Sequence, residues 1–558
     1  MNRVPLEALP KNRPPLVMFQ CILLAAWITA AASITNVFIS QEFGVDDRSC
    51  FHANGTLPCK STSFALGILD DVAFYEETLF ILSIRDKYQA LPTQVQISQP
   101  RADRHVFLTS ADDSSTTVID SGSEFSGVII GTQKGSTTYN IHVSNIEFQQ
   151  FSANLAAVVM MWNSNNITFT NCVFKDNERS GINAFDSGVT IEGCVFSNNT
   201  GNVQRTRFSP DLPSVAGGAG FVYEKANGLT LIVRGTNFTG NSAAVNDVIP
   251  TVKSIVSVLN YLGGGLLVYF HGTAKSNKAL VENTVLVKNK ATLGGGLYLA
   301  VDKTALTQND TGNEVEVQGT SFVSNNASQF GGGLRILIGS ASFGTKTLIK
   351  DCVIRDNVAR RGGGTDVVVA ENLPLLSHLQ FDNVTWERNS GRDGAAVRLG
   401  SQSLTEYSAI ISVIPEFIDC TIQNHHASYY TFTSPFTSQG VSVKFTRTNV
   451  FSRNQGIGAM RYLDGGLHVN GTLKFTENSG YVGGAVFLSS SQITLYPGSE
   501  LSFVRNRALN IGGAIAVFNP VSYEVIREYN PHCFVTYSEE RTKPSEWKVT
   551  NEPRRESV

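Results

Sequence analysis

Short runs of alternating apolar and polar residues follow one another along most of the chain. Examples are GLRILIG at residues 333–339 and GVTIEGCVF at residues 188–196. Side chains that alternate with a period of two point to opposite faces of a β-strand, so these runs predict strands. The apolar positions do not recur at the spacing of an amphipathic helix, and phenylalanine and β-branched residues are frequent. The pattern therefore predicts an all-β protein.

A short phrase recurs within this pattern. It consists of a large apolar residue, usually Phe, two variable residues and an Asn. In most copies a triplet of small residues begins five or six positions after the Asn, and another apolar residue follows the triplet. Equivalent apolar positions are separated by 22 residues (Phe174 to Phe196) up to 48 residues (Phe238 to Leu286), so loops of different length join copies of one unit. A degenerate copy follows Ile422, where His425 replaces the Asn.

A repeat of this size predicts stacked coils and not a globular core. Short strands, one coil per repeat and Gly-marked corners favour a parallel β-helix of roughly a dozen or more coils over a helical solenoid. In such a fold the aromatic residue faces inward and stacks on its counterpart about 4.8 Å away. The Asn lies three positions further on, which is the opposite face of a straight strand. We therefore expect a bend that turns both side chains inward.

Each part of the phrase then has a structural role. The Asn amides satisfy backbone groups at the bend and bond to one another as a ladder. The small triplet marks a corner where a Cβ would clash or where φ is positive, because a flexible Gly linker would not keep a constant distance from the Asn. We expect the ladder to include Asn177, Asn199, Asn325, Asn357, Asn478 and Asn506, and the core stack to include Phe174, Phe196, Phe322, Phe475 and Phe503.

The N-terminal 33 residues have the features of a targeting segment. Arg3, Lys11 and Arg13 precede an apolar run at residues 16–33 that ends in small residues, as in a secretory signal peptide. The run is also long enough for an uncleaved membrane anchor helix. Both readings place the rest of the chain in the secretory lumen. We divide the chain into residues 1–33 (signal or anchor), 34–65 (a cysteine-bracketed segment), 66–520 (the β-helix) and 521–558 (a C-terminal segment and loose tail).

The cysteines and sequons fit a secreted protein. Cys50 and Cys59 bracket a short turn-rich loop and are candidates for a local disulfide. Cys172 and Cys194 fall at equivalent positions of neighbouring coils, where either a disulfide or two buried thiols is compatible with the pattern. Candidate N-glycosylation sites are Asn54, Asn166, Asn198, Asn237, Asn309, Asn326, Asn383 and Asn470.

Charge and motifs narrow the range of partners. The net charge is −3 and the pI about 6.3, which does not indicate a nucleic-acid-binding protein. The sequence contains no metal-ligand spacing, phosphate loop or nucleophile motif, so we expect no cofactor. The expected partner is an extracellular protein or a glycan. Contact with a membrane is expected only through residues 16–33, if they are not cleaved.

The repeated phrase resembles the FxxN and GGA[ILV] motifs of the polymorphic outer membrane protein family. Phe322 with Asn325 matches the first motif, and residues 483–486 and 512–515 match the second. The segments at residues 57–66, 166–174 and 528–537 look still more like the large secreted or membrane-attached animal proteins with such repeats. The resemblance spans about residues 55–537. It implies a right-handed parallel β-helix with an adhesive or structural role at the cell surface, and it identifies no catalytic residues.

Carbohydrate-active enzymes also use β-helices, so the fold alone does not decide the function. Glycoside hydrolysis needs two carboxyl groups across a groove, and a lyase needs a carboxylate-bound cation and a basic proton acceptor. The best candidates flank the small triplets on adjacent coils, where they are equally compatible with solvated corners. They are Glu387, Asp393, Arg398, Asp356 and Asp366. We expect a non-enzymatic structural or adhesive scaffold, with a glycan-binding module and, third, a polysaccharide lyase or hydrolase as alternatives.

Overall fold

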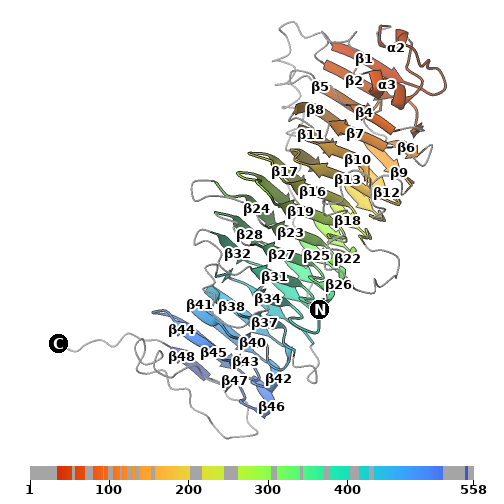
Figure 1. Ribbon diagram of the computed structural model, residues 1–558. Helices are drawn as coiled ribbons and strands as arrows, with labels where there is room; N and C mark the ends of the chain where they lie inside the picture. Colours follow the sequence, from red (N-terminus) through yellow and green to blue (C-terminus); the bar gives the residue numbers. More distant parts are fainter. Residues whose placement is uncertain are drawn as a thin grey trace, which may run out of the picture.

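The chain forms a long rod of stacked strands (Figure 1). The computed structural model describes residues 34–52, 57–68, 79–91, 94–97, 105–112, 116–121, 127–131, 137–152, 157–201, 216–243, 262–302, 311–339, 344–369, 377–401, 414–426, 433–518 and 547–550. The targeting segment therefore lies outside the described residues, as does most of the predicted C-terminal segment. Strands follow one another along the rod in chain order, from β1 and β2 at one end to β46 and β47 at the other.

Two large sheets form most of the wall. The 14-stranded sheet pairs every strand in parallel with its counterpart on the next coil, so each coil contributes one strand. Its strands are β4 (Gln94–Ile97), β7 (Gly127–Gly131), β10 (Ala157–Trp162), β13 (Ser180–Phe185), β16 (Ala219–Tyr223), β19 (Leu266–Phe270), β23 (Leu297–Val301), β27 (Leu334–Ile338), β31 (Thr365–Val369), β34 (Val397–Ser401), β37 (Phe436–Gln439), β40 (Met460–Leu463), β43 (Val486–Ser489) and β47 (Ile515–Phe518).

The 28-stranded sheet contains two parallel stacks. The first consists of β1 (Ile34–Ile39), β2 (Leu79–Ile84), β5 (His105–Ser110), β8 (Thr137–Ser144), β11 (Ser164–Thr170), β14 (Val189–Glu192), β17 (Thr230–Arg234), β20 (Lys278–Glu282), β24 (Glu314–Gln318), β28 (Lys346–Lys350), β32 (His378–Asp382), β35 (Glu416–Ile418), β38 (Val443–Ser452), β41 (Gly466–Thr476) and β44 (Gln492–Leu495). β38 and β41 also run through the second stack, whose other strands are β3 (Tyr88–Leu91), β6 (Thr117–Ser121), β9 (Ile146–Gln149), β12 (Val173–Lys175), β15 (Val195–Ser197), β18 (Asn237–Thr239), β21 (Val285–Val287), β25 (Ser321–Val323), β29 (Val353–Arg355), β33 (Thr385–Glu387), β36 (Thr421–Gln423) and β45 (Glu500–Val504).

Two small sheets line the turn that follows the ladder asparagines. One contains β22 (Lys290–Leu293), β26 (Asn326–Phe330) and β30 (Val358–Arg361). The other contains β39 (Gln455–Gly456), β42 (Ser479–Val482) and β46 (Arg507–Ile511). All strand pairs within these sheets are parallel. A winding chain whose successive coils pair in parallel is a parallel β-helix, as the repeat predicts.

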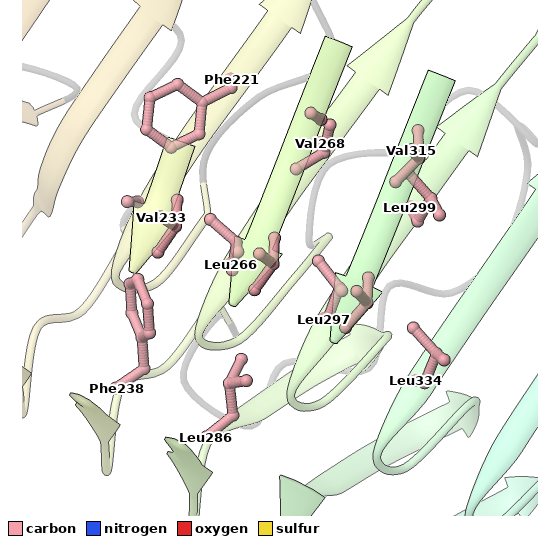
Figure 2. Packing of buried hydrophobic residues seen from close by; sticks show 14 of the residues in the cluster. Phe221, Val233, Phe238, Leu266, Val268, Leu286, Leu297, Leu299, Val315 and Leu334 are labelled. Carbon is pink, nitrogen blue, oxygen red and sulfur yellow. The ribbon is translucent and has the colours of Figure 1, made fainter. Parts of the chain in front are cut away.

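The core is a column of side chains inside the coils. Equivalent residues on successive coils form files, and Figure 2 shows Leu266, Leu297 and Leu334 following one another along the 14-stranded sheet. Phe238 and Leu286 form a second file, on β18 and β21. In the 28-stranded sheet inward apolar and outward polar residues alternate, for example in β24. This alternation is why a period-two pattern suffices to build the wall.

The asparagine file lies inside the wall. Asn325 Nδ2 donates to Asn357 Oδ1 at 3.0 Å and to the Leu286 carbonyl at 2.8 Å. Its Oδ1 accepts the backbone N–H and the Nδ2–H of Asn289, both at 3.0 Å. The side chain is 0% exposed, and all four of its hydrogen bonds hold neighbouring coils together. The same contacts link the buried side chains of Asn177 to Asn199, Asn357 to Asn389, and Asn478 to Asn506.

The predicted bend lies between the aromatic residue and the Asn. The residue immediately before each ladder Asn is in the left-handed region, with φ of 54° at Ser324 and 56° at Asp356. This single residue turns the chain, so the aromatic side chain and the Asn both face inward. The Phe174 and Phe196 rings stack at 4.8 Å and the Phe475 and Phe503 rings at 5.3 Å, while Phe322 is 0% exposed in the same file.

The glycine triplets form the corner before the 14-stranded sheet. The first glycine has a positive φ, as at Gly331 (67°). A Cβ on the second glycine, Gly332, would meet the carbonyl oxygen of Gly363 on the next coil. A positive φ therefore requires a small residue at the first position of this corner, and close backbone packing requires one at the second.

The two ends of the rod differ from its middle. Helix α3 (Thr62–Ile68) packs against β4 and buries Ala65 and Leu66 at the N-terminal end of the core. The Ser61 hydroxyl caps the helix by accepting the Phe64 N–H at 3.2 Å. The short helix α2 (Ser49–His52) carries Cys50, which is joined to Cys59 by a disulfide. At the other end β48 (Trp547–Thr550) pairs antiparallel with β45 and covers part of that edge.

Candidate functional site

A cluster of charged side chains lies on the outer face of the 14-stranded sheet. Arg335 of β27, Asp366 of β31 and Arg398 of β34 occupy the same register position on three successive coils. Arg398 Nη1 donates to Asp366 Oδ1 at 3.0 Å, and Arg335 Nη1 donates to the other oxygen of that carboxylate. Arg398 Nε donates to Asp393 Oδ2 at 3.1 Å. We call these four residues the charge cluster.

Three of the four residues of the charge cluster are almost entirely removed from solvent, while the Asp393 side chain is 23% exposed. Asp366 is 0% exposed and the two arginines are each 9% exposed. The Phe330 ring lies beside them, with the guanidinium carbons of Arg335 and Arg398 at 4.6 and 5.9 Å from its centroid. Burial lowers the pKa of Arg398, but the carboxylates of Asp366 and Asp393 raise it, and the net direction is upward. The arrangement joins three coils through fixed opposite charges.

The other two carboxyl candidates lie elsewhere on the coil. Asp356 follows β29 and Glu387 ends β33, both in the 28-stranded sheet. Arg388 links them, with Nε at 2.8 Å from Asp356 Oδ1 and Nη1 at 2.6 Å from Glu387 Oε1. The Arg388 side chain is 47% exposed, so this group is a solvated surface contact. The structure thus brings Asp366, Asp393 and Arg398 together and separates them from Asp356 and Glu387.

Sequence reasoning missed Arg335, which completes the charge cluster, and Phe330, whose ring lies beside it. A signal for Arg335 was present in the repeat. The residue after the apolar position that follows each triplet is Tyr298, Arg335, Asp366 and Arg398 in consecutive copies. Aligning that position would have placed opposite charges in one file. Phe330 carried no comparable signal, because it lies in a turn of irregular register.

Of the two alternatives left open for Cys172 and Cys194, the structure has the second, because both are free, buried thiols and the candidate disulfide is not formed. They hold equivalent positions on adjacent coils, so their side chains are displaced by about one coil spacing of 4.8 Å, whereas a disulfide needs about 2 Å between sulfurs. The Cys194 thiol lies 3.5 Å from the Glu192 carbonyl, to which it donates. Thr284 makes the same contact in the same file, at 3.0 Å.

The cysteines thus act as weak donors at a position that Thr284 also occupies. Cys352 and Cys420 donate to the carbonyls of Lys350 and Ile418, two residues earlier in each case. Burial raises the pKa of both thiols to about 12, so they remain protonated at neutral pH. They behave as small buried side chains.

Aromatic rings also lie on the outer face of the 14-stranded sheet. Trp162 and Phe185 stack on each other with centroids 4.2 Å apart and planes 15° from parallel. Both are only partly buried. The stack covers one face of each ring, and the far sides of the pair are occupied by the neighbouring coils at Gly131 and Val222, so the pair is a poor stacking platform for a sugar ring. The pair therefore gives little support to a glycan-binding face.

The described part of the chain contains neither a candidate membrane span nor a candidate metal-binding group. No helix there is long and apolar enough to cross a membrane. No group of three or more His, Cys, Asp or Glu side chains within those same residues is arranged to hold a metal ion.

Comparison with known proteins identifies the fold. A family model described as a right handed beta helix region matches residues 106–285. The chain is a right-handed parallel β-helix. A search of curated proteins gives no match. Among solved structures, the β-helix is similar to the crystal structure of PfbA, a surface adhesin of Streptococcus pneumoniae. The identity is 10% and the TM-score 0.25, over 87% of this chain and 90% of that chain, so this similarity does not bear on function.

Proposed function

We propose that this protein is a non-enzymatic scaffold of the extracellular space or cell surface, with a structural or adhesive role. The observation that carries the proposal is the pairing of every candidate carboxylate. Asp366 is fully buried between two guanidinium groups, and Asp393 is bonded to one of them. A hydrolase or lyase needs a carboxyl group that reaches substrate and exchanges a proton or binds a cation. Here the Asp366 carboxylate joins three coils, and the Asp393 carboxylate is held by Arg398 of its own coil.

Further observations support an extracellular location. The described residues contain one disulfide, Cys50–Cys59, and disulfides persist in oxidising compartments. The apolar run at residues 16–33 has the composition of a signal peptide or an anchor. The repeats match the FxxN and GGA[ILV] phrases of the polymorphic outer membrane protein family and its animal counterparts, which carry adhesive or structural roles. A rod of stacked coils provides a long, stiff surface on which partners are held.

The proposal is tested with the full chain expressed in a secretory host. We expect secretion or surface display, and binding of protein-coated beads to immobilised extracellular proteins or to a glycan array. We expect no depolymerisation when purified protein is incubated with a panel of neutral and uronic acid polysaccharides. Retention inside the cell would contradict the extracellular location.

The enzyme alternative has its own decisive outcome. Release of oligosaccharides by the wild-type protein, abolished in D393N with an unchanged melting temperature, would overturn the scaffold proposal. D356N is the matched control, because Asp356 belongs to the exposed pair on the other sheet. Loss of activity in D393N alone would assign the chemistry to the charge cluster. Equal activity in both variants would place it elsewhere, and would still contradict a non-enzymatic role.

A further inference from the structure

The sequons are distributed unevenly around the rod. Six lie within the described residues, and all six asparagines are exposed. Five lie in or beside strands of the 28-stranded sheet, and the sixth is the first residue of β26. No sequon falls within a strand of the 14-stranded sheet. The six are Asn166, Asn198, Asn237, Asn326, Asn383 and Asn470, while Asn54 and Asn309 lie outside the described residues.

The alternation that builds the wall also exposes these sequons. In β18, Asn237 and Thr239 are exposed and Phe238 between them is 0% exposed in the core. The same holds around Asn383, where the middle residue Val384 is buried. An acceptor asparagine and its hydroxyl residue two positions later therefore point outward together, and a glycan on that asparagine leaves the core undisturbed.

The buried asparagines are kept out of sequons by the corner that follows them. A ladder asparagine such as Asn325 is followed two positions later by a small residue, here Ala327, which is buried at the turn. In nine of the ten ladder copies this position is Ala or Gly, and in the tenth it is Arg179. No ladder asparagine therefore begins a sequon, so the modifying enzyme has no acceptor among the residues whose amides hold the coils together.

The outer face of the 14-stranded sheet is a different environment. Its outward side chains include Val222, Leu267, Tyr298 and Ala300, none more than 4% exposed. Residues of β16 and β23 are buried at all five positions. A glycan attached there would have to displace this second apolar layer, and exposing it to water would be unfavourable.

We propose that N-linked glycans occupy the six exposed sequons and cover the 28-stranded sheet and the β22–β26–β30 sheet, while the 14-stranded sheet carries none. The inference rests on the secretory location proposed above. Transfer joins the asparagine amide nitrogen to C1 of an oligosaccharide and breaks the bond from C1 to the pyrophosphate of its lipid carrier. The pyrophosphate leaves with one amide proton. Each asparagine keeps one N–H, so the bond from Asn383 to Asp351 (2.7 Å) can persist after modification.

Site mapping tests the occupancy. The secreted full chain is deglycosylated with an amidase in heavy-oxygen water, and each converted asparagine is identified by mass spectrometry. We expect conversion at most of the six positions and at no ladder asparagine. Secreted protein without conversion at the six would overturn this inference while leaving the scaffold proposal intact. Failure of the wild-type chain to be secreted would instead contradict the scaffold proposal.

A pair of added sequons tests the asymmetry. S321N/V323T places Asn-Phe-Thr on β25, at the register that Asn237, Phe238 and Thr239 occupy on β18. R461N/L463T places Asn-Tyr-Thr on β40 in the 14-stranded sheet, with the Asn and the Thr at outward positions that are half-buried. We expect the first variant to be secreted at the wild-type level with one more glycan. We expect the second to be secreted at least tenfold less.

R461N/L463V controls for the substitutions themselves, because it lacks the acceptor hydroxyl. We expect R461N/L463V to be secreted several-fold better than R461N/L463T. Normal secretion of R461N/L463T with a glycan at the new site would show that the 14-stranded sheet tolerates carbohydrate and would overturn the asymmetry. Equal loss of secretion in both variants would also overturn it, since the glycan would then have no effect of its own.

Discussion

Protonation of His425 should break one link of the ladder that joins the coils. His425 occupies the ladder position between Asn389 and Asn454 and is 0% exposed. The Asn389 N–H donates to its Nδ1 at 3.1 Å, and Nε2 donates to the Trp386 carbonyl at 3.2 Å. The neutral ring with its proton on Nε2 thus reproduces two of the contacts of an asparagine. A second proton on Nδ1 would turn the acceptor of the Asn389 N–H into a donor, with only the Asn389 carbonyl at 3.2 Å to accept it, and would place a charge in the core.

The magnitude follows from the pKa. Burial lowers the pKa of His425 from 6.5 to about 4, against the opposing effect of the two backbone contacts. Because the folded-state pKa lies below the unfolded one, the stabilisation is complete above about pH 6.5 and is lost as the pH falls toward 4. A shift of 6.5 to about 4 corresponds to about 3 kcal/mol of unfolding free energy.

The assay compares the wild type with H425N, which restores an asparagine ladder. Unfolding in urea is followed by circular dichroism between pH 7.5 and pH 4, and hydrogen exchange reports on the coils around Trp386. We expect the wild type to lose about 3 kcal/mol more than H425N over this range. His142, whose pKa burial also lowers to about 4, contributes equally to both proteins and cancels in the difference. Parallel pH profiles for the two proteins would refute the reasoning.

Three further changes follow from the same contacts. N325L leaves the ladder partners of Asn325 unpaired, and each buried group without a partner destabilises the fold by about 1–3 kcal/mol. The melting temperature should therefore fall sharply, and an unchanged melting temperature would contradict a buried amide ladder. G332A should lower the free energy of unfolding by about 1–3 kcal/mol, because the added methyl group meets a carbonyl of the next coil. G513A is the control and should be nearly neutral, because its methyl group faces open space. Equal urea midpoints for the two variants would show that the corner is not tightly packed. Cys352 and Cys420 should resist iodoacetamide at pH 8 in the native protein and react after unfolding, because both thiols are buried and their pKa is raised. Peptide mass mapping reads the labelling, and labelled cysteines in native protein would contradict this account.

The sequence was sufficient to predict the coil. Every copy of the phrase must satisfy the same local geometry, so the spacing of Phe322 and Asn325 and the small residues from Gly331 onward predict the stack, the bend and the corner. In a solenoid each coil contacts mainly its neighbours, which is why a local pattern contains most of the fold.

What lies on the outside of the coil depended on the tertiary structure. Arg335, Asp366 and Arg398 are 31 and 32 residues apart, and they meet because loops of unequal length return the chain to the same register. The outer face of the 14-stranded sheet is buried at β23 and β31 although these strands resemble the others in period, because burial depends on what packs against a strand. Alternation in a sequence determines which residues share a face of a strand, whereas only the arrangement of the whole chain determines whether that face meets water.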